Sequence, residues 1–149
     1  MNPVDALVFD LGGVIIDIDF ERVFARWAEL ARCDPAAIRS RFSQDAAYEE
    51  HERGELDARG YFACLRRSLG LSLTDEQFAD GWAQIFIGES PGMAALARRA
   101  AARWPLYVFT NSNAAHQAIW SQRYAPALEP FRRIFVSSEL GQRKPEPAA

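Results

Sequence analysis

An apolar run opens the chain and ends in an aspartate followed by two glycines: residues 4–13 read Val-Asp-Ala-Leu-Val-Phe-Asp-Leu-Gly-Gly. A short run of this kind, rich in β-forming residues and closed by glycine, predicts a buried parallel strand over residues 4–9. Polar functional groups in open α/β sheets gather at the carboxyl ends of such strands, which makes Asp10 the first candidate catalytic residue. A carboxylate there can act as a nucleophile. The alternative is an aspartate that only terminates the strand.

Two further segments place polar side chains after strands or in loops. Residues 105–110 form a second β-like run that ends in Thr110 and Asn111, and a third short run covers residues 133–136. Farther on, Lys144 lies in a loop between a glycine and two prolines. Taken singly, Thr110 is an ordinary strand residue and Lys144 an ordinary surface lysine. The order strand–Asp, strand–Thr-Asn, loop–Lys-Pro is more specific than any one of them.

These three motifs, in this order, resemble the first three motifs of the haloacid dehalogenase (HAD) superfamily of hydrolases, whose nucleophile is an aspartate. Residues 9–20, 51–55 and 140–145 are similar to the alpha-D-glucose-1-phosphate phosphatase branch, and the resemblance covers essentially the whole chain. It implies a HAD-like Rossmannoid α/β core with a parallel sheet and an inserted helical cap. It also implies a Mg²⁺-dependent phosphatase that acts on a small phosphorylated metabolite, such as the sugar phosphate glucose 1-phosphate.

The resemblance also implies roles for particular residues. Asp10 would attack phosphorus and carry the phosphoryl group as an aspartyl-phosphate. Thr110 and Asn111 would bind the phosphate or the substrate. Lys144 would balance the charge on Asp10 and on the phosphoryl oxygens, a role that suits an ammonium group. Mg²⁺ would be bound by the Asp10 carboxylate, by the backbone carbonyl of Gly12 and by acidic residues farther on, in line with its preference for oxygen ligands.

Helical patterns fill the interval between the first two strand motifs. Apolar residues recur at helical spacing over residues 20–31. Start and stop signals predict four more helices in this interval and one beyond it. Those in the interval are Asp34-Pro35 toward Phe42, Asp57 to Leu69 before Gly70, Thr74 with its capping box to about Ile87, and Ser90-Pro91 to Arg103; the one beyond runs from Asn113 to Tyr124. We therefore expect a helical cap over residues 18–88 and an incomplete core over residues 1–17 and 89–149.

The chain departs from the superfamily pattern at two places. Gly12 stands where most of these phosphatases have a second aspartate as general acid and base, a contribution typically worth about 10²–10⁴-fold in rate. Its loss is most tolerable with a good leaving group, such as an anomeric sugar oxygen. No strand with a fourth, acidic motif follows Lys144. We therefore expect a C-terminally truncated member of the superfamily, whose first strand, residues 4–9, is an exposed apolar edge.

Two alternatives to the phosphatase stay open. A 2-haloacid dehalogenase also uses an aspartate nucleophile, and it needs neither a metal nor an aspartate at position 12. The other alternative is a truncated, non-catalytic remnant that binds a partner. The match of the opening motif and of residues 51–55 to the phosphatase branch favours the phosphatase.

Composition limits the other classes of function. The chain has 149 residues, of which 49% are hydrophobic and 25% charged, which suits one folded domain and excludes general disorder. A net charge of −3 without a basic block argues against a nucleic-acid surface. Cys33 and Cys64 are isolated and form no metal or disulfide pattern. With neither a signal-peptide pattern nor a membrane-spanning run, we expect a cytoplasmic protein. The sequence indicates no particular oligomeric state.

Overall fold

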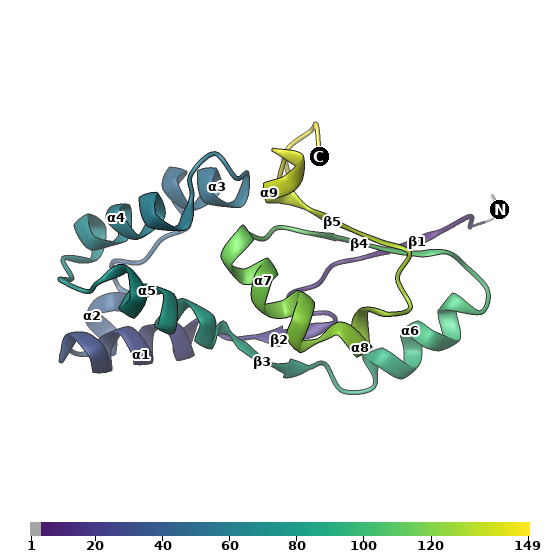
Figure 1. Ribbon diagram of the computed structural model, residues 1–149, viewed down its shortest axis with the longest axis horizontal. Coiled ribbons are helices and arrows are strands. Elements are labelled where there is room, and N and C mark those ends of the chain that lie inside the picture. Colours follow the sequence, from purple (N-terminus) through teal and green to yellow (C-terminus); the bar gives the residue numbers. More distant parts are fainter. Residues whose placement is uncertain (1–3) are drawn as a thin grey trace.

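The computed structural model describes residues 4–149, and a three-stranded parallel sheet lies at its centre (Figure 1). The strands, in their spatial order, are β1 (Leu7–Phe9), β4 (Leu106–Thr110) and β5 (Arg133–Val136). Both pairings are parallel, with Leu7 opposite Leu106 and Thr110 opposite Val136. The predicted α/β class and three parallel strands are confirmed, although β1 begins at Leu7 rather than at residue 4. Residues 1–3 of the predicted core lie outside the described residues.

One face of this sheet is covered by helices. In Figure 1 three helices lie together below the sheet: α6 (Met93–Ala101), α7 (Ala114–Arg123) and α8 (Ala125–Leu128). Along β4 the side chains of Leu106 and Val108 are fully buried, while those of Tyr107 and Phe109, which alternate with them, are only partly buried. Successive side chains of a strand point to opposite faces. The half-open face therefore carries aromatic rings, and Lys144 Nζ lies 5.4 Å from the centre of the Phe109 ring.

The strand β1 lies at an edge of the sheet. Within residues 4–149 it pairs with β4 alone, and its Val8 side chain is 65% exposed. This confirms the expectation of an exposed apolar edge at the first strand. The unpaired backbone groups of such an edge can pair with another strand.

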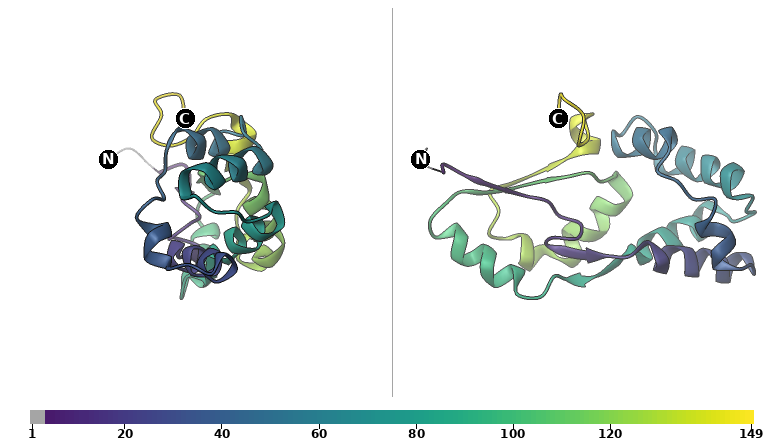
Figure 2. Two further views of the ribbon diagram at one scale, coloured as in Figure 1. Left: turned by 90° about the vertical axis from the view of Figure 1, so that its left-hand side faces the viewer. Right: turned by 180° about the vertical axis from the view of Figure 1, so that it is seen from behind.

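Five helices of the described chain gather at one end of the molecule (Figures 1 and 2). They are α1 (Phe20–Ala31), α2 (Pro35–Arg39), α3 (Ala46–Glu52), α4 (Ala58–Leu69) and α5 (Asp75–Trp82). The predicted signals are confirmed: Asp34 and Asp57 cap α2 and α4, Gly70 ends α4 with φ 68°, and Thr74 forms a capping box. However, α2 ends before Phe42, and α3 was not among the predicted helices. Within residues 4–149, no helix has the length and apolar character needed to cross a bilayer.

The largest correction concerns the junction between these helices and the sheet. The pattern predicts a helix to about Ile87, but α5 ends at Trp82, and a 3₁₀ turn, η1 (Ala83–Ile85), leads into β3 (Phe86–Glu89). This strand pairs antiparallel with β2 (Ile16–Ile18), which the sequence analysis did not predict. Aromatic and β-branched residues near position 86 suit a pleated strand, and the distant partner strand overrides their local helical pattern.

A second correction concerns the start of α6. The dipeptide Ser90-Pro91 predicts the N-terminus of this helix, but α6 begins at Met93, after Gly92 with φ 78°. The Ser90 hydroxyl instead donates a hydrogen bond to the Asp17 carboxylate, and the Ser90 amide donates one to the Ile15 carbonyl (2.9 Å). Ser90 therefore closes the β2–β3 ribbon and does not cap the helix. Both connections between the helices and the sheet pass through this ribbon, while the boundaries 17/18 and 88/89 stay a prediction.

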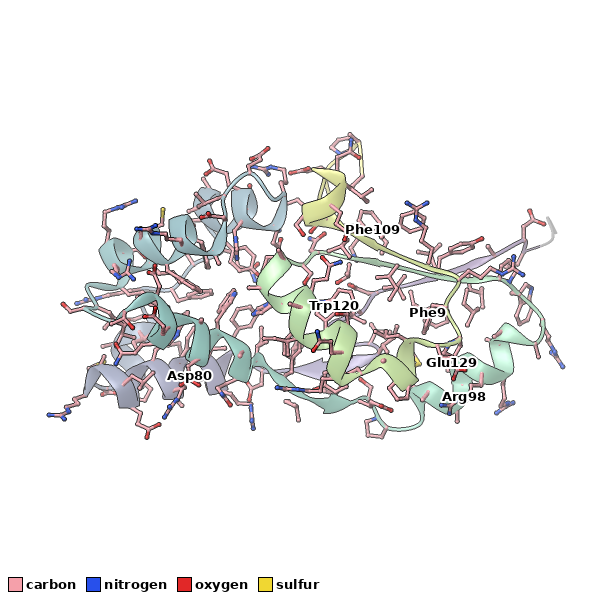
Figure 3. All side chains as sticks on the ribbon, in the orientation of Figure 1. Phe9, Asp80, Arg98, Phe109, Trp120 and Glu129 are labelled. Carbon is pink, nitrogen blue, oxygen red and sulfur yellow. The ribbon has the colours of Figure 1, made fainter. Side chains whose placement is uncertain are left out.

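Aromatic rings fill the interior of the five-helix cap. The Trp27 and Trp82 rings stack with their centres 5.7 Å apart, and Trp27 Nε1 donates a hydrogen bond to the Phe78 carbonyl (3.0 Å). All three of these side chains are buried. Figure 3 shows how side chains fill the space between the ribbons, with Trp120 inside and Asp80 at the surface. The cap therefore has a core of its own, which continues into the core of the sheet domain.

The close approach of α1 and α5 requires a glycine at position 81. A Cβ atom there would lie 2.1 Å from Trp27 Cδ1, a contact that the buried ring cannot relieve. We expect Gly81→Ala to lower the free energy of unfolding by about 1–3 kcal/mol, although alanine alone would favour the helix. Urea unfolding measures this change. Gly88→Ala is the matched control, because a Cβ at Gly88 meets no atom within 4 Å. Equal stability of Gly81→Ala and wild type would contradict the packing argument.

Candidate active site

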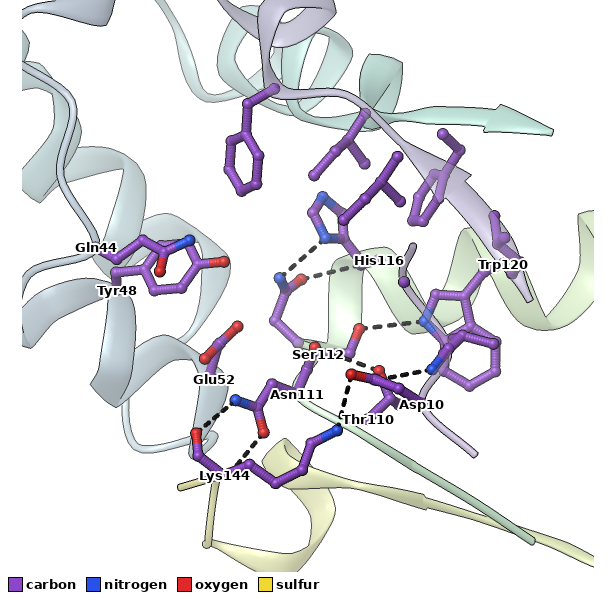
Figure 4. Close-up of a pocket in the computed structure, with 18 residues that line it drawn as sticks. Asp10, Gln44, Tyr48, Glu52, Thr110, Asn111, Ser112, His116, Trp120 and Lys144 are labelled. Carbon is purple, nitrogen blue, oxygen red and sulfur yellow. Dashed lines mark hydrogen bonds and ion pairs between the residues drawn. The ribbon is translucent and has the colours of Figure 1, made fainter. Parts of the chain in front are cut away.

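The predicted catalytic groups meet at the carboxyl ends of the parallel strands. Asp10 follows β1, Thr110 ends β4, and Lys144 lies in the loop after α9 (Ser137–Leu140). Lys144 Nζ lies 3.0 Å from Asp10 Oδ2 (Figure 4). The other oxygen of Asp10, Oδ1, accepts a hydrogen bond from the Leu11 amide (2.7 Å). The Asp10 side chain is 46% exposed, so this carboxylate is oriented and still accessible to a ligand.

Lys144 is held in place from the core side by Asn111. The Asn111 amide donates a hydrogen bond to the Lys144 carbonyl and accepts one from the Lys144 N–H, each 2.8 Å long. The ammonium of Lys144 also donates a hydrogen bond to the Phe109 carbonyl (2.8 Å). The sequence predicts a contact of Asn111 with phosphate or substrate. The structure shows both ends of its amide engaged with Lys144, so its visible contribution is to place the lysine.

Two serines that the sequence analysis missed fix the loop after β4. Ser137 Oγ accepts a hydrogen bond from the Ser112 amide (2.9 Å) and donates one to the Ser112 carbonyl (3.0 Å). Trp120 Nε1 donates to the Ser112 hydroxyl (3.1 Å). All three side chains are buried. Thr110, the buried last residue of β4, lines the cavity directly before this fixed loop.

A buried histidine links this loop to the cap. His116 Nε2 donates to the Trp82 carbonyl (3.1 Å), which leaves Nδ1 as the acceptor for the Asn113 amide (3.3 Å). The ring also stacks on the Trp82 ring at 4.7 Å. Burial lowers the pKa of His116 to about 3, although its bond to the Trp82 carbonyl opposes the shift. The imidazole is therefore neutral at neutral pH, and its Nε2 bond to the Trp82 carbonyl joins α7 to the end of α5.

The cap and the core together enclose a cavity of about 190 Å³ over the Asp10–Lys144 pair. The core contributes Asp10, Thr110 and Lys144, and the cap contributes three polar residues at a spacing of four: Gln44, Tyr48 and Glu52. Figure 4 shows these cap side chains on the opposite side of the cavity from Asp10. Burial raises the pKa of the Tyr48 hydroxyl, and the Glu52 carboxylate raises it further. Of these cap residues, only Glu52 lies in a motif that the sequence analysis singled out, residues 51–55.

Gly12 lines the cavity beside Asp10. A Cβ at this position would lie 3.1 Å from Ile18 Cδ1, so the glycine lets the β2 side chain pack close to the site. Within residues 4–149, no group of three or more His, Cys, Asp or Glu side chains gathers in a way that could hold a metal ion. Asp10 and Gly12, which the sequence resemblance implies as metal ligands, both line this cavity.

Comparisons with known proteins agree with the fold described above. No family model matches the chain. It is 25% identical over 146 residues to a D-ribitol-5-phosphate phosphatase from Bacteroides thetaiotaomicron, covering 95% of this chain and 71% of that protein. A crystal structure of a HAD family enzyme from the same organism superposes with a TM-score of 0.83 at 21% identity, over 99% of this chain and 75% of that one. A 2-haloacid dehalogenase from Pseudomonas syringae is more distant, with a TM-score of 0.58 at 20% identity, over 98% and 69%.

The fold of this chain is therefore the fold of the solved HAD family enzymes. Membership of the HAD superfamily, which the three motifs of the sequence indicate, stays a prediction. The closer resemblance to the glucose-1-phosphate branch stays a proposal.

The buried His116 predicts a dependence of stability on pH. Below about pH 6.5 the unfolded chain binds a proton on this imidazole, while the folded chain resists protonation down to about pH 3. The free energy of unfolding should therefore fall as the pH falls through this window, by up to about 1.4 kcal/mol per pH unit from this residue. Urea unfolding between about pH 7 and about pH 5 measures the slope. His116→Gln should have a shallower slope than wild type, and parallel slopes would contradict this account.

Proposed function

We propose that the protein is a phosphatase that hydrolyses a small sugar phosphate or polyol phosphate through an aspartyl-phosphate on Asp10. The observation that carries the proposal is the Asp10 carboxylate, accessible and held 3.0 Å from the Lys144 ammonium at the carboxyl ends of parallel strands. A nucleophile paired with a fixed cation suits phosphoryl transfer, where positioning and charge neutralisation dominate. The similarity to a D-ribitol-5-phosphate phosphatase supports the same substrate class.

In the first step, an Asp10 oxygen would attack phosphorus in line with the leaving group. The bond from phosphorus to the substrate oxygen breaks, and that oxygen departs with the electron pair and takes a proton from water. In the second step, water attacks phosphorus, which releases inorganic phosphate and regenerates Asp10. The Lys144 ammonium and the Thr110 hydroxyl would stabilise the charge on the phosphoryl oxygens. Because Gly12 supplies no general acid, this scheme favours substrates with a good leaving group, such as a sugar 1-phosphate.

The balance of charge at the site supports a divalent cation. The two carboxylates of the cavity are each paired with a cation, Asp10 with Lys144 and Glu52 with Arg143. A bound phosphate dianion would therefore add negative charge without a partner. Mg²⁺ supplies that neutralisation when bound, and it typically uses one or two carboxylates together with water and substrate phosphate. The Asp10 carboxylate and the Gly12 carbonyl would hold it. A neighbouring HAD structure, with a TM-score of 0.78, is a complex with magnesium and inorganic phosphate.

The cavity favours a small, hydroxylated leaving group. Its volume of about 190 Å³ lies below the range of about 300–1,000 Å³ typical of drug-sized ligands. On the side opposite Asp10, Gln44, Tyr48 and Glu52 present an amide, a phenol and a carboxylate. These groups can donate to and accept from the hydroxyls of a sugar or polyol. Glucose 1-phosphate and ribitol 5-phosphate both fit this description.

Phosphate release tests the proposal. We expect the purified chain to hydrolyse glucose 1-phosphate, ribitol 5-phosphate and an aryl phosphate, with higher rates when Mg²⁺ is present. Asp10→Asn keeps the shape of the side chain and removes the nucleophile, so it should lower kcat by roughly 10³-fold or more. Asp5→Asn is the matched control, since Asp5 is exposed and precedes β1. Its rate should equal that of wild type.

Other outcomes of the same assay distinguish the alternatives. Halide release from a 2-haloacid that is lost in Asp10→Asn, without phosphate release, would replace the phosphatase by a dehalogenase. Equal background rates from wild type and Asp10→Asn with every substrate would mean that this chain is not catalytic. Robust phosphate release that persists in Asp10→Asn would show that the nucleophile lies elsewhere.

A further inference from the structure

Ion pairs join the cap helix α3 to the loop that carries Lys144. From the loop, Arg143 donates to Glu52 (Nε to Oε2, 2.8 Å) and to Glu49 (Nη1 to Oε1, 3.2 Å). From the cap, Arg53 donates through Nη1 to Glu146 Oε1 (2.8 Å). Arg143 and Glu146 flank Lys144 in the sequence. The residues before and after the site lysine are therefore tied to one end of the same cap helix.

The loop has an internal geometry that passes this connection to Lys144. Glu146 Oε2 accepts a hydrogen bond from the Arg143 amide (3.1 Å), and the Glu146 amide donates to the Arg143 carbonyl (2.9 Å). Residues 143–146 thus form a closed turn with Lys144 inside it. The Arg143 amide and the Arg53 guanidinium hold the pKa of Glu146 below its usual range, against a smaller opposing effect of burial. Two hydrogen bonds therefore tie the two ends of the turn to each other.

Burial separates the Arg143–Glu52 pair from the other ion pairs of the cap. The Arg143 and Glu52 side chains are 12% and 8% exposed, while the Arg39–Glu21 pair within the cap is 55% and 51% exposed. Exposed pairs contribute little, because water and salt screen them. Breaking a buried pair leaves a charge without a partner in a poorly solvated place, so the surrounding groups rearrange. Loss of the Arg143 charge should therefore disturb the turn, and loss of the Arg39 charge should not.

Gly54 lets α3 approach the loop closely enough for these contacts. It follows α3 with φ 73°, a conformation that side chains rarely adopt. A Cβ at Gly54 would also lie 2.4 Å from the carbonyl oxygen of Ser138, in α9. Since that obstacle is backbone, the end of the cap helix would have to move away from α9. Substitution of Gly54 therefore tests the contact between α3 and the loop by a steric change, whereas substitution of Arg143 tests it by removal of a charge.

We propose that Arg143 is a positioning residue: it couples the packing of the cap against the core to the placement of Lys144 beside Asp10. When α3 lies against the core, Glu52 and Glu49 hold Arg143, Arg53 holds Glu146, and the turn between them sets the lysine 3.0 Å from the Asp10 carboxylate. When the cap separates, the turn loses its outer support, so its contacts with Asn111 loosen as well. Lys144 therefore reaches its position beside Asp10 only when the cap encloses the cavity.

Hydrogen exchange on the whole chain tests the structural part without any substrate. In the turn, the Arg143, Lys144 and Glu146 amides donate to Glu146, Asn111 and Arg143, so their exchange rates report its order. Arg143→Met should speed their exchange by about tenfold or more and leave β4 unchanged. Gly54→Ala should have the same effect at the same amides. Arg39→Met is the matched control and should leave the turn as in wild type.

Steady-state kinetics test the functional part, which rests on the proposed phosphatase activity. With an aryl phosphate, Arg143→Met should lower kcat by about 10–100-fold, because misplacement of a site group by about 1 Å can cost roughly 10²-fold, while KM changes by less than about threefold. Arg143→Lys keeps the charge and should recover most of the kcat. A purely structural role would instead lower the active fraction of enzyme and would not respond to this conservative change.

The exchange and kinetic measurements distinguish failure of the positioning proposal from failure of the proposed phosphatase activity. Unchanged exchange of the turn in both Arg143→Met and Gly54→Ala would overturn the proposal, whatever the activity. Faster exchange with unchanged kcat would also overturn it, because Lys144 would then not need the cap for its placement. An inactive wild type that still shows the exchange effect would refute the phosphatase and leave the coupling of α3 to the turn established. Faster exchange in β4 would show that a variant has lost protection throughout the fold. In that case the exchange of the turn is compared between Arg143→Lys and wild type.

Discussion

The parallel pairing of β1, β4 and β5 is the constraint on which the rest of this structure depends. Since the three strands run in the same direction, their carboxyl ends meet at one edge of the sheet, and Asp10, Thr110 and the loop with Lys144 come together there. Parallel strands cannot be joined by a tight turn, so the chain must cross over between them. The helical cap occupies the crossover from β1 to β4, which brings it over the same edge.

The cap is attached to the core by three kinds of contact, and each of them also shapes the site. The β2–β3 ribbon carries both chain connections and places Ile18 against Gly12. The His116 imidazole bonds and stacks with Trp82, which joins the aromatic core of the cap to the loop after β4. Arg143 and its partners join α3 to the turn around Lys144. A change in any one of these contacts would therefore reach the cavity and not only the stability of the fold.

Local signals allowed much of the fold to be predicted, and the errors lie where a distant partner decides the outcome. The Asp57, Gly70 and Thr74 signals set the ends of α4 and the start of α5 correctly, since a cap acts within one helical turn. The pattern around Ile87 predicts a helix, whereas the structure has β3 there, because its partner strand β2 lies at the other end of the cap segment in the sequence and becomes its neighbour only in the folded chain.

The sequence by itself determined the strand runs, most helix ends and the identity of Asp10, Thr110, Asn111 and Lys144 as the polar groups that follow the strands. These features depend on periodicity, capping and strand composition, which act over a few neighbouring residues. Only the tertiary structure decided that Asn111 holds the Lys144 backbone, that His116 is buried and neutral, and that α3 binds the turn around the lysine. Such contacts join side chains far apart in the chain, and their geometry exists only once the cap has packed against the core.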